Sequence, residues 1–227
     1  MRPAGDDPVI PDEITIDALD PEVRSGLRSL PKGLADLVGR HLIMAGRLIE
    51  EDPARAHAHA LAATRRAARV AVVREAAGLT AYALGRYDTA RNELRAYSRM
   101  SGSDDYLPVL ADCERGLGKP ERALAIAAGS SASKLDRAGR IEMRIVAAGA
   151  RRDMGQLDAA IVALQGPDLK SKSREPWAAR LRYAYADALL AAGRTEEAKE
   201  WFANAAAADL DGSTDALERA TALQAGH

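Results

Sequence analysis

Four short segments of this chain repeat one pattern: a glycine, an acidic residue three positions later, and an alanine five positions later. The segments are Gly85–Ala90, Gly118–Ala123, Gly155–Ala160 and Gly193–Ala198. Their glycines are 33, 37 and 38 residues apart. Repetition with this period is typical of folds that stack similar units of secondary structure. The chain is therefore expected to be an array of repeated units.

Each position of the pattern suits a pair of helices joined by a tight turn. Glycine after the first helix can take the left-handed conformation without a steric cost. The acid falls in the first turn of the second helix, where a carboxylate meets free N–H groups; the four acids are Asp88, Glu121, Asp158 and Glu196. The alanine lets the two helices approach closely, as do the small residues seven positions before each glycine, Gly78, Ala111, Ala148 and Ala186.

The rest of the chain also has a helical pattern. Apolar residues recur at i, i+3 and i+4 from Leu34 onward, and no segment alternates with period two over a useful length. Aromatic residues make up only 4% of the chain, and alanine, the best helix former, dominates its apolar residues. The predicted fold class is all-α. One turn, between Thr64 and Glu75, has neither glycine nor proline to mark it.

The pattern resembles the tetratricopeptide repeat (TPR) family. In the best copy the matching residues are Gly78, Ala81, Gly85, Tyr87, Ala90, Leu94 and Tyr97. The resemblance implies a right-handed α-solenoid of about five helix pairs. The expected copies are 37–70, 71–104, 104–137, 141–174 and 179–212, the first being degenerate. In the later four copies, the family's aromatic residue at the start of the first helix is replaced by Arg74, Leu107, Arg144 and Arg182.

The expected domain organisation places short segments on both sides of the array, which spans 37–212. Residues 1–19 are predicted to be a disordered acidic tail, although the tail could instead lie on the body of the protein. Residues 20–36 are predicted to hold an N-terminal capping helix that begins at Asp20-Pro21, and residues 213–227 a C-terminal capping helix. The Ala and Arg usage of the chain resembles that of proteins from high-GC bacteria.

Composition argues against several classes of function. The formal net charge of −1 gives no overall attraction to nucleic acid or to anionic membranes. A single cysteine, Cys113, excludes an internal disulfide and fits a reducing compartment. The sequence has no secretory signal pattern and no apolar stretch long enough for a membrane span, so a cytoplasmic location is expected.

Catalytic and cofactor motifs are absent from the sequence. It contains neither Gly-x-Ser-x-Gly nor Gly-x-Gly-x-x-Gly. His57 and His59 lie two positions apart on a helix, so they point in different directions and cannot chelate one metal well. We therefore predict a protein that is not an enzyme and that has no cofactor and no metal site.

The TPR resemblance implies a function in binding other proteins. In the family the first helices line a concave groove that holds a peptide or helix. The inward-facing positions transferred to this chain are His41, Leu48, Glu75, Leu79, Tyr82, Asp112, Arg115, Arg152, Tyr183 and Asp187. Each of these residues could instead serve packing between repeats or lie on plain surface.

Two alternatives to a partner-binding scaffold stay open. The first is a structural homo-oligomer. The second is association with nucleic acid through a basic cluster, Arg65, Arg66, Arg69 and Arg74. That cluster has no aromatic residue among its arginines on which bases could stack, so we expect this second alternative to be the weaker one.

Overall fold

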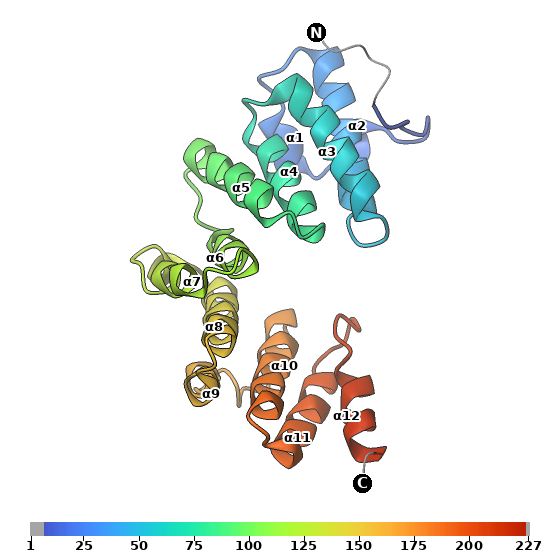
Figure 1. Ribbon diagram of the computed structural model, residues 1–227. Coiled ribbons are helices and arrows are strands. Elements are labelled where there is room, and N and C mark those ends of the chain that lie inside the picture. Colours follow the sequence, from blue (N-terminus) through green and yellow to red (C-terminus); the bar gives the residue numbers. More distant parts are fainter. Residues whose placement is uncertain (1–6, 226–227) are drawn as a thin grey trace. The chain divides into compact units, whose positions relative to one another are not determined.

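The structure is a computed structural model that describes residues 7–225, and every regular element in that range is helical (Figure 1). It contains twelve α-helices, α1 to α12, in the described residues. None of these helices is both long and apolar enough to cross a membrane. The predicted all-α fold class is confirmed. The chain divides into two compact units, unit 1 up to Tyr106 and unit 2 from Leu107.

Unit 1 holds the first five helices. They are α1 (Pro21–Gly26), α2 (Lys32–Leu48), α3 (Pro53–Ala67), α4 (Ala71–Ala83) and α5 (Tyr87–Ser101). Helix α2 packs on α3, α4 packs on α5, and α4 also contacts α1, α2 and α3. The pairs α2–α3 and α4–α5 therefore stack on each other through a shared apolar core.

The N-terminal segment of unit 1 is packed, whereas the sequence predicted a disordered tail over residues 1–19. The side chain of Ile14 is only 3% exposed, in the core that α2 and α4 also line. Arg40 of α2 donates from Nε to the Ile14 carbonyl at 2.7 Å and from Nη2 to the Pro11 carbonyl at 3.2 Å. The prediction is therefore wrong for residues 7–19, because apolar side chains spaced among the acids anchor the segment. Residues 1–6 lie outside the described range.

Unit 2 holds three further helix pairs and a final helix. They are α6 (Leu107–Gly116), α7 (Pro120–Ala127), α8 (Arg137–Asp153), α9 (Leu157–Leu164), α10 (Pro176–Ala191), α11 (Thr195–Ala206) and α12 (Ala216–Ala225). The first helix of each pair packs on its own second helix and on the next first helix, so that α6 contacts α8 and α8 contacts α10. Consecutive first helices are therefore neighbours within this unit.

The repeated glycines end the first helices as the pattern predicted. All four have a positive φ, between 67° and 75°. At each one, the N–H of the following residue bonds to the carbonyl five positions before it, as in Arg86 to Ala81 (2.9 Å) and Arg194 to Leu189 (3.0 Å). This bond is the six-to-one bond of the Schellman motif, which satisfies a carbonyl that the helix end leaves free.

The close contact between paired helices rests on small side chains. The four pattern alanines, Ala90, Ala123, Ala160 and Ala198, are at most 1% exposed. The tightest approach is in the α4–α5 pair, where a Cβ built on Gly78 would lie 2.6 Å from Cγ of Leu94 and 3.3 Å from its backbone N. Leu94 is itself fully buried. A side chain at position 78 would therefore force the two helices apart.

Three arginines stand where the TPR pattern has an aromatic residue, and each one donates hydrogen bonds to backbone carbonyl groups. Arg74 donates to Ala68 at 2.7 Å, in the turn between α3 and α4 that carries no glycine. Arg144 donates to Leu164 and Gln165, at the end of α9, at 2.8 and 2.9 Å. Arg182 donates to Ser171 and to Asn204 of α11. At these positions the side chains therefore bond to backbone carbonyls, most of which lie near helix ends.

We predict that Gly78→Ala destabilises unit 1 by about 1–3 kcal/mol, because overpacking displaces Leu94 or its helix. The matched control is Gly46→Ala in α2, where a new Cβ would meet nothing within 4 Å. Removing a helical glycine there should stabilise the protein by up to about 1 kcal/mol. Urea unfolding followed by circular dichroism measures both changes, and equal behaviour of the two variants would contradict the close-approach interpretation.

Candidate functional site

A hollow in unit 2, here called the C-groove, is lined by three successive first helices. Its volume is about 180 Å³. Its apolar lining comes from α8 and α10, and its charged lining comes from α6, α8 and α10. The lining residues are Arg115, Ile145, Ala148, Gly149, Arg152, Tyr183, Ala184, Asp187 and Ala188. Four of the predicted groove residues, Arg115, Arg152, Tyr183 and Asp187, are thus brought together, while their role in binding stays a prediction.

Ion pairs join the helices around the C-groove. Asp187 of α10 pairs with Arg152 of α8 through Oδ2 and with Arg219 of α12 through Oδ1, the latter at 2.9 Å. Arg219 also donates to the Tyr183 hydroxyl at 2.8 Å, and its guanidinium lies 4.2 Å from the ring centroid of Phe202. Asp187 therefore ties α8 and α12 to α10 at one side of the groove.

The other side of the C-groove is formed by Arg115 of α6. It bonds to Asp112 at 2.5 Å and, from Nε, to Asp153 of α8 at 2.8 Å. Burial opposes the charged form, but the bond to Asp153 and the charges of Asp112 and Asp153 together raise the pKa of Arg115. A Cβ on Gly149 would lie 2.6 Å from the guanidinium carbon. The absence of a side chain at Gly149 therefore provides the space that the Arg115 guanidinium occupies against α8.

A second hollow, here called the N-groove, lies in unit 1 between α1, α2 and α4. Its volume is about 190 Å³ and its lining is almost entirely apolar. The lining residues are Leu19, Val23, Leu42, Ala45, Gly46, Ile49, Val72, Glu75, Ala76, Leu79 and Thr80. Two predicted groove residues, Glu75 and Leu79, belong to it.

Glu75 is the one ionisable residue that lines the N-groove among the residues the structure describes. Its Oε1 accepts a hydrogen bond from the Tyr106 hydroxyl. Burial raises the pKa of Glu75, the Tyr106 bond lowers it, and the charges of Glu22 and Asp105 raise it further. Burial, and then the hydrogen bond to Glu75 and the charge of its carboxylate, raise the pKa of Tyr106. The Glu75 carboxylate is therefore already bonded to Tyr106, and burial makes its charged form less favourable than in water.

Three other predicted groove residues lie outside both hollows. Tyr82 packs edge-on against Tyr87, with ring centroids 6.0 Å apart. Leu48 is partly buried against the unit 1 core, and Asp112 pairs with Arg115. These three side chains make contacts inside the protein, and their role in binding a partner stays a prediction.

His41 was predicted to line the groove, and this prediction is wrong. Its side chain is only 2% exposed, and its Nδ1 lies 3.0 Å from Nδ1 of His59. His57, also buried, lies 3.0 Å from the Thr80 hydroxyl through its own Nδ1. His57 and His59 thus point to different partners. A partner protein cannot reach His41 because α3 covers it, with His59 at its side.

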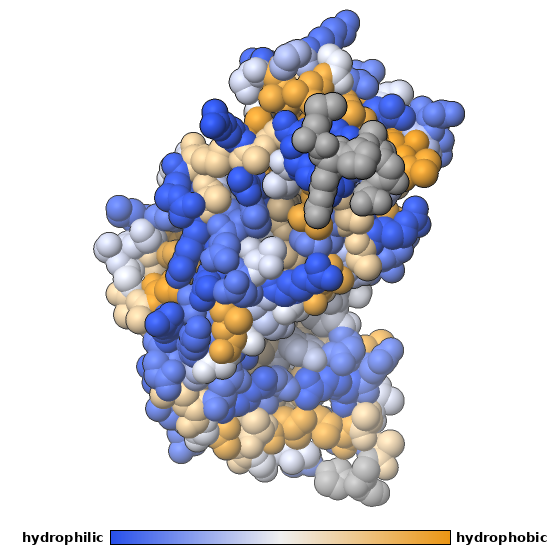
Figure 2. All heavy atoms as spheres, turned by 45° about the horizontal axis from the view of Figure 1, so that its top comes forward, coloured by the Kyte–Doolittle hydropathy of each residue, from blue (hydrophilic) through white to orange (hydrophobic). Residues whose placement is uncertain are grey.

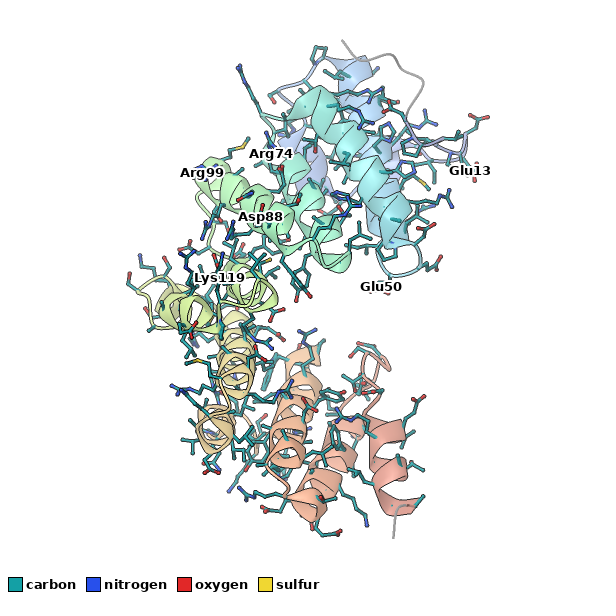
Figure 3. The ribbon with its side chains drawn as sticks, viewed as in Figure 1. Glu13, Glu50, Arg74, Asp88, Arg99 and Lys119 are labelled. Carbon is teal, nitrogen blue, oxygen red and sulfur yellow. The ribbon has the colours of Figure 1, made fainter. Side chains whose placement is uncertain are left out.

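The predicted basic cluster is largely neutralised by acids of unit 1. Asp7 bonds to both Arg66 and Arg65, and these two bonds hold the pKa of Asp7 at about 2 despite some burial. Arg74, labelled in Figure 3, pairs with Glu93 of α5 at 2.7 Å. Only Arg69 of the four lacks such an acid among the described residues. The cluster therefore gives little support to nucleic-acid binding.

Sequence reasoning missed the role of Arg219, which joins the C-groove network from α12. The signal was weak because one arginine on a short terminal helix has no pattern around it. It also missed Gly149, which the TPR pattern does not require.

Figure 2 shows hydrophilic side chains over most of the visible face, with hydrophobic residues in scattered patches. Surface hydrophobicity alone therefore does not single out a site.

Comparison with known proteins supports the fold. No protein-family model matches the chain, and no curated protein matches it. Among solved structures, it is similar to the crystal structure of nearly identical TPR-like repeats from a Podosopora anserina protein described as a kinesin light chain, with a TM-score of 0.54 and 16% identity. The match covers 82% of this chain and 94% of the other. The fold is therefore that of TPR-like helical repeats.

We predict that acid destabilises unit 1 before unit 2. Burial first, then the charges of His59 and Arg66, lower the pKa of His41 to about 4, and burial also lowers the pKa of His57 and His59. The folded state thus holds these rings neutral, while the unfolded chain protonates them near pH 6.5. Their contribution is complete above that pH and is lost as pH falls toward 4, by up to about 3 kcal/mol for His41.

Both tryptophans, Trp177 and Trp201, lie in unit 2, so their fluorescence reports that unit alone. Between pH 6.5 and 4, urea midpoints from circular dichroism should show an early transition that moves to lower urea. The tryptophan transition should move less. The His41→Asn/His59→Asn variant, which keeps a donor and an acceptor in place, should flatten the dependence. An equal shift of both transitions in the wild type would contradict the assignment.

Proposed function

We propose that this chain is a non-catalytic binding module that holds a peptide or helix of another protein in the C-groove. The observation that carries the proposal is the lining of this hollow by three successive first helices, α6, α8 and α10. A segment lying across them can contact each helix pair of unit 2 in turn. We propose a cytoplasmic location, as the sequence predicts.

The size of the hollow favours a side chain over a small-molecule ligand. Ligand pockets usually enclose about 300–1,000 Å³, whereas the C-groove encloses about 180 Å³. Ile145, Ala184 and Ala188 offer an apolar surface next to the ring of Tyr183. Tyrosine and arginine are frequent anchors at protein interfaces. An apolar side chain projecting from a partner segment fits this lining.

The charges of the C-groove favour specificity more than strong attraction. Its arginines are matched by acids in the network of Asp112, Asp153 and Asp187. A highly charged partner therefore gains little from entering. Paired charges at the edge of an interface fix orientation and exclude wrong partners more than they add affinity. We expect the partner segment to be amphipathic, with its apolar face toward α8 and α10.

The test blocks the hollow with one added side chain. Ala184→Arg places a long charged group in the C-groove, whereas the control Val162→Arg adds the same group on α9, at a residue that is 64% exposed. We predict that partners captured by the wild type from its native cell fall about tenfold or more with Ala184→Arg and are unchanged with Val162→Arg. Circular dichroism and tryptophan fluorescence verify that both variants are folded.

A photo-reactive amino acid at position 145 identifies what occupies the groove. A crosslinked product with the mass of the chain plus another protein supports the proposal. A product of twice the chain mass would instead favour the homo-oligomer. Capture that survives Ala184→Arg would contradict the C-groove as the binding surface.

A further inference from the structure

Another hollow in unit 2, here called the loop site, is formed by the connection between α9 and α10 and by one side of α11. Its volume is about 290 Å³. Four basic residues line it: Lys170, Lys172, Arg174 and Arg182. No acidic residue lines it, and it shares no residue with the C-groove. The two sites are therefore chemically and spatially distinct surfaces of one unit.

The basic residues of the loop site have no acidic partners among the described residues. No ion pair involves any of the four in residues 7–225. The nearest acid in the sequence before the loop, Asp168, is engaged by Arg137 at 2.8 Å and by Arg144 at 3.1 Å. This contrasts with the C-groove, where each arginine has an aspartate. Four positive charges without an ion-pair partner among the described residues therefore line the loop site.

Arg182 lies beneath the loop and orients it. Its guanidinium donates to the Ser171 carbonyl and, at 3.5 Å, to the Asn204 carbonyl, so both partners are neutral. Burial lowers the pKa of Arg182. A partly buried charge that bonds only to neutral groups is stabilised further by an anion. Arg182 thus supplies a fixed positive charge at the base of the loop site.

Two serine hydroxyls in the loop are poised to donate hydrogen bonds. Oγ of Ser171 accepts from the backbone N–H of Ser173 at 3.3 Å, and Oγ of Ser173 accepts from that of Glu175 at 3.2 Å. Because each Oγ already accepts a hydrogen bond from a backbone N–H, its own O–H can still donate one. The hydroxyls stand between the lysines in the order Lys-Ser-Lys-Ser-Arg. The loop therefore alternates positive charges with neutral donors.

We propose that the loop site binds a phosphate monoester, held by Lys170, Lys172, Arg174 and Arg182 with the hydroxyls of Ser171 and Ser173. Such a group carries a charge of about −1.5 to −2 at neutral pH and three acceptor oxygens. Four cations and two hydroxyl donors match that charge and that number of acceptors better than they match a carboxylate, which has one charge and two oxygens. Arginine and lysine are also the residues that bind phosphate most often.

The surroundings suit a phosphate carried on a larger group. Trp201 and the alanines at 207 and 208 line the same hollow from the α11 side. Trp201 is fixed edge-on against Tyr185, with ring centroids 5.0 Å apart. The phosphate would lie at the loop, while the group that bears it contacts this apolar wall. The sources of such a group are a phosphorylated side chain of a partner protein and a free phosphorylated metabolite.

The test measures binding of named probes to the full chain by isothermal titration calorimetry at fixed ionic strength. The probes are inorganic phosphate, a capped peptide with one phosphoserine, and the same peptide with unmodified serine. The loop variant is Lys170→Gln/Lys172→Gln/Arg174→Gln, whose three side chains are exposed. The control, Arg28→Gln/Arg47→Gln/Arg69→Gln, removes three exposed charges from unit 1.

We expect the phosphopeptide to bind the wild type and the control equally, and the loop variant about tenfold or more weakly. Phosphopeptide binding much tighter than that of inorganic phosphate assigns the source to a protein partner, and equal binding assigns it to a free monoester. Loss of binding in the control as large as in the loop variant would overturn the proposal, because it would show a general charge effect. Equal binding of the unmodified peptide, or no binding of phosphate and phosphopeptide by the wild type, would overturn it as well.

Discussion

The structure depends on the close approach of paired helices at small residues. In each of the four pairs that carry the glycine pattern, an alanine of the second helix, such as Ala160, is buried to 1% exposure or less, and the small-residue position of the first helix is alanine or glycine. With no long side chain between them, the helices are held by many weak contacts at short range. The Schellman turns then fix the point at which each pair reverses. Close approach and tight reversal together define the repeat.

This packing leaves the outward faces of the first helices free for function. Because α6 contacts α8 and α8 contacts α10, half-buried side chains of the three helices meet in one hollow, where Arg115, Arg152 and Asp187 form ion pairs between helices. The same stacking makes the connections between pairs into surface loops. The loop site arises on the longest of them within unit 2, where Arg182 takes the place of an aromatic residue and binds the loop from below. One repeated packing rule thus produces two hollows with linings of different chemistry.

The fold was predictable from local pattern, whereas much of the site was not. Glycine, acid and alanine act within a few residues of one another, so their spacing identified the turns and pairs correctly. The packing of the N-terminal segment and the neutralisation of the arginines depend on long-range contacts. Asp7, for example, bonds to Arg65 and Arg66, which are 58 and 59 residues away, and a repeat pattern in the sequence does not predict such contacts. His41 was placed in the groove by its position in the TPR pattern, which does not show that His59, 18 residues later, covers it and lies within hydrogen-bond distance. The loop site was missed because its charges stand in a segment without repeat pattern.

Close approach of α8 and α9 at Ala160 positions the helices that line the C-groove. Hydrogen–deuterium exchange with mass spectrometry on the Ala160→Leu variant tests it most directly. Faster exchange of backbone amides is expected in α8, α9 and the contacting helix α10, with exchange in α2 to α5 of unit 1 unchanged. The control Val162→Leu, at an exposed position of the same helix, should exchange as the wild type does. Unchanged protection of α8 and α9 in Ala160→Leu would contradict the account.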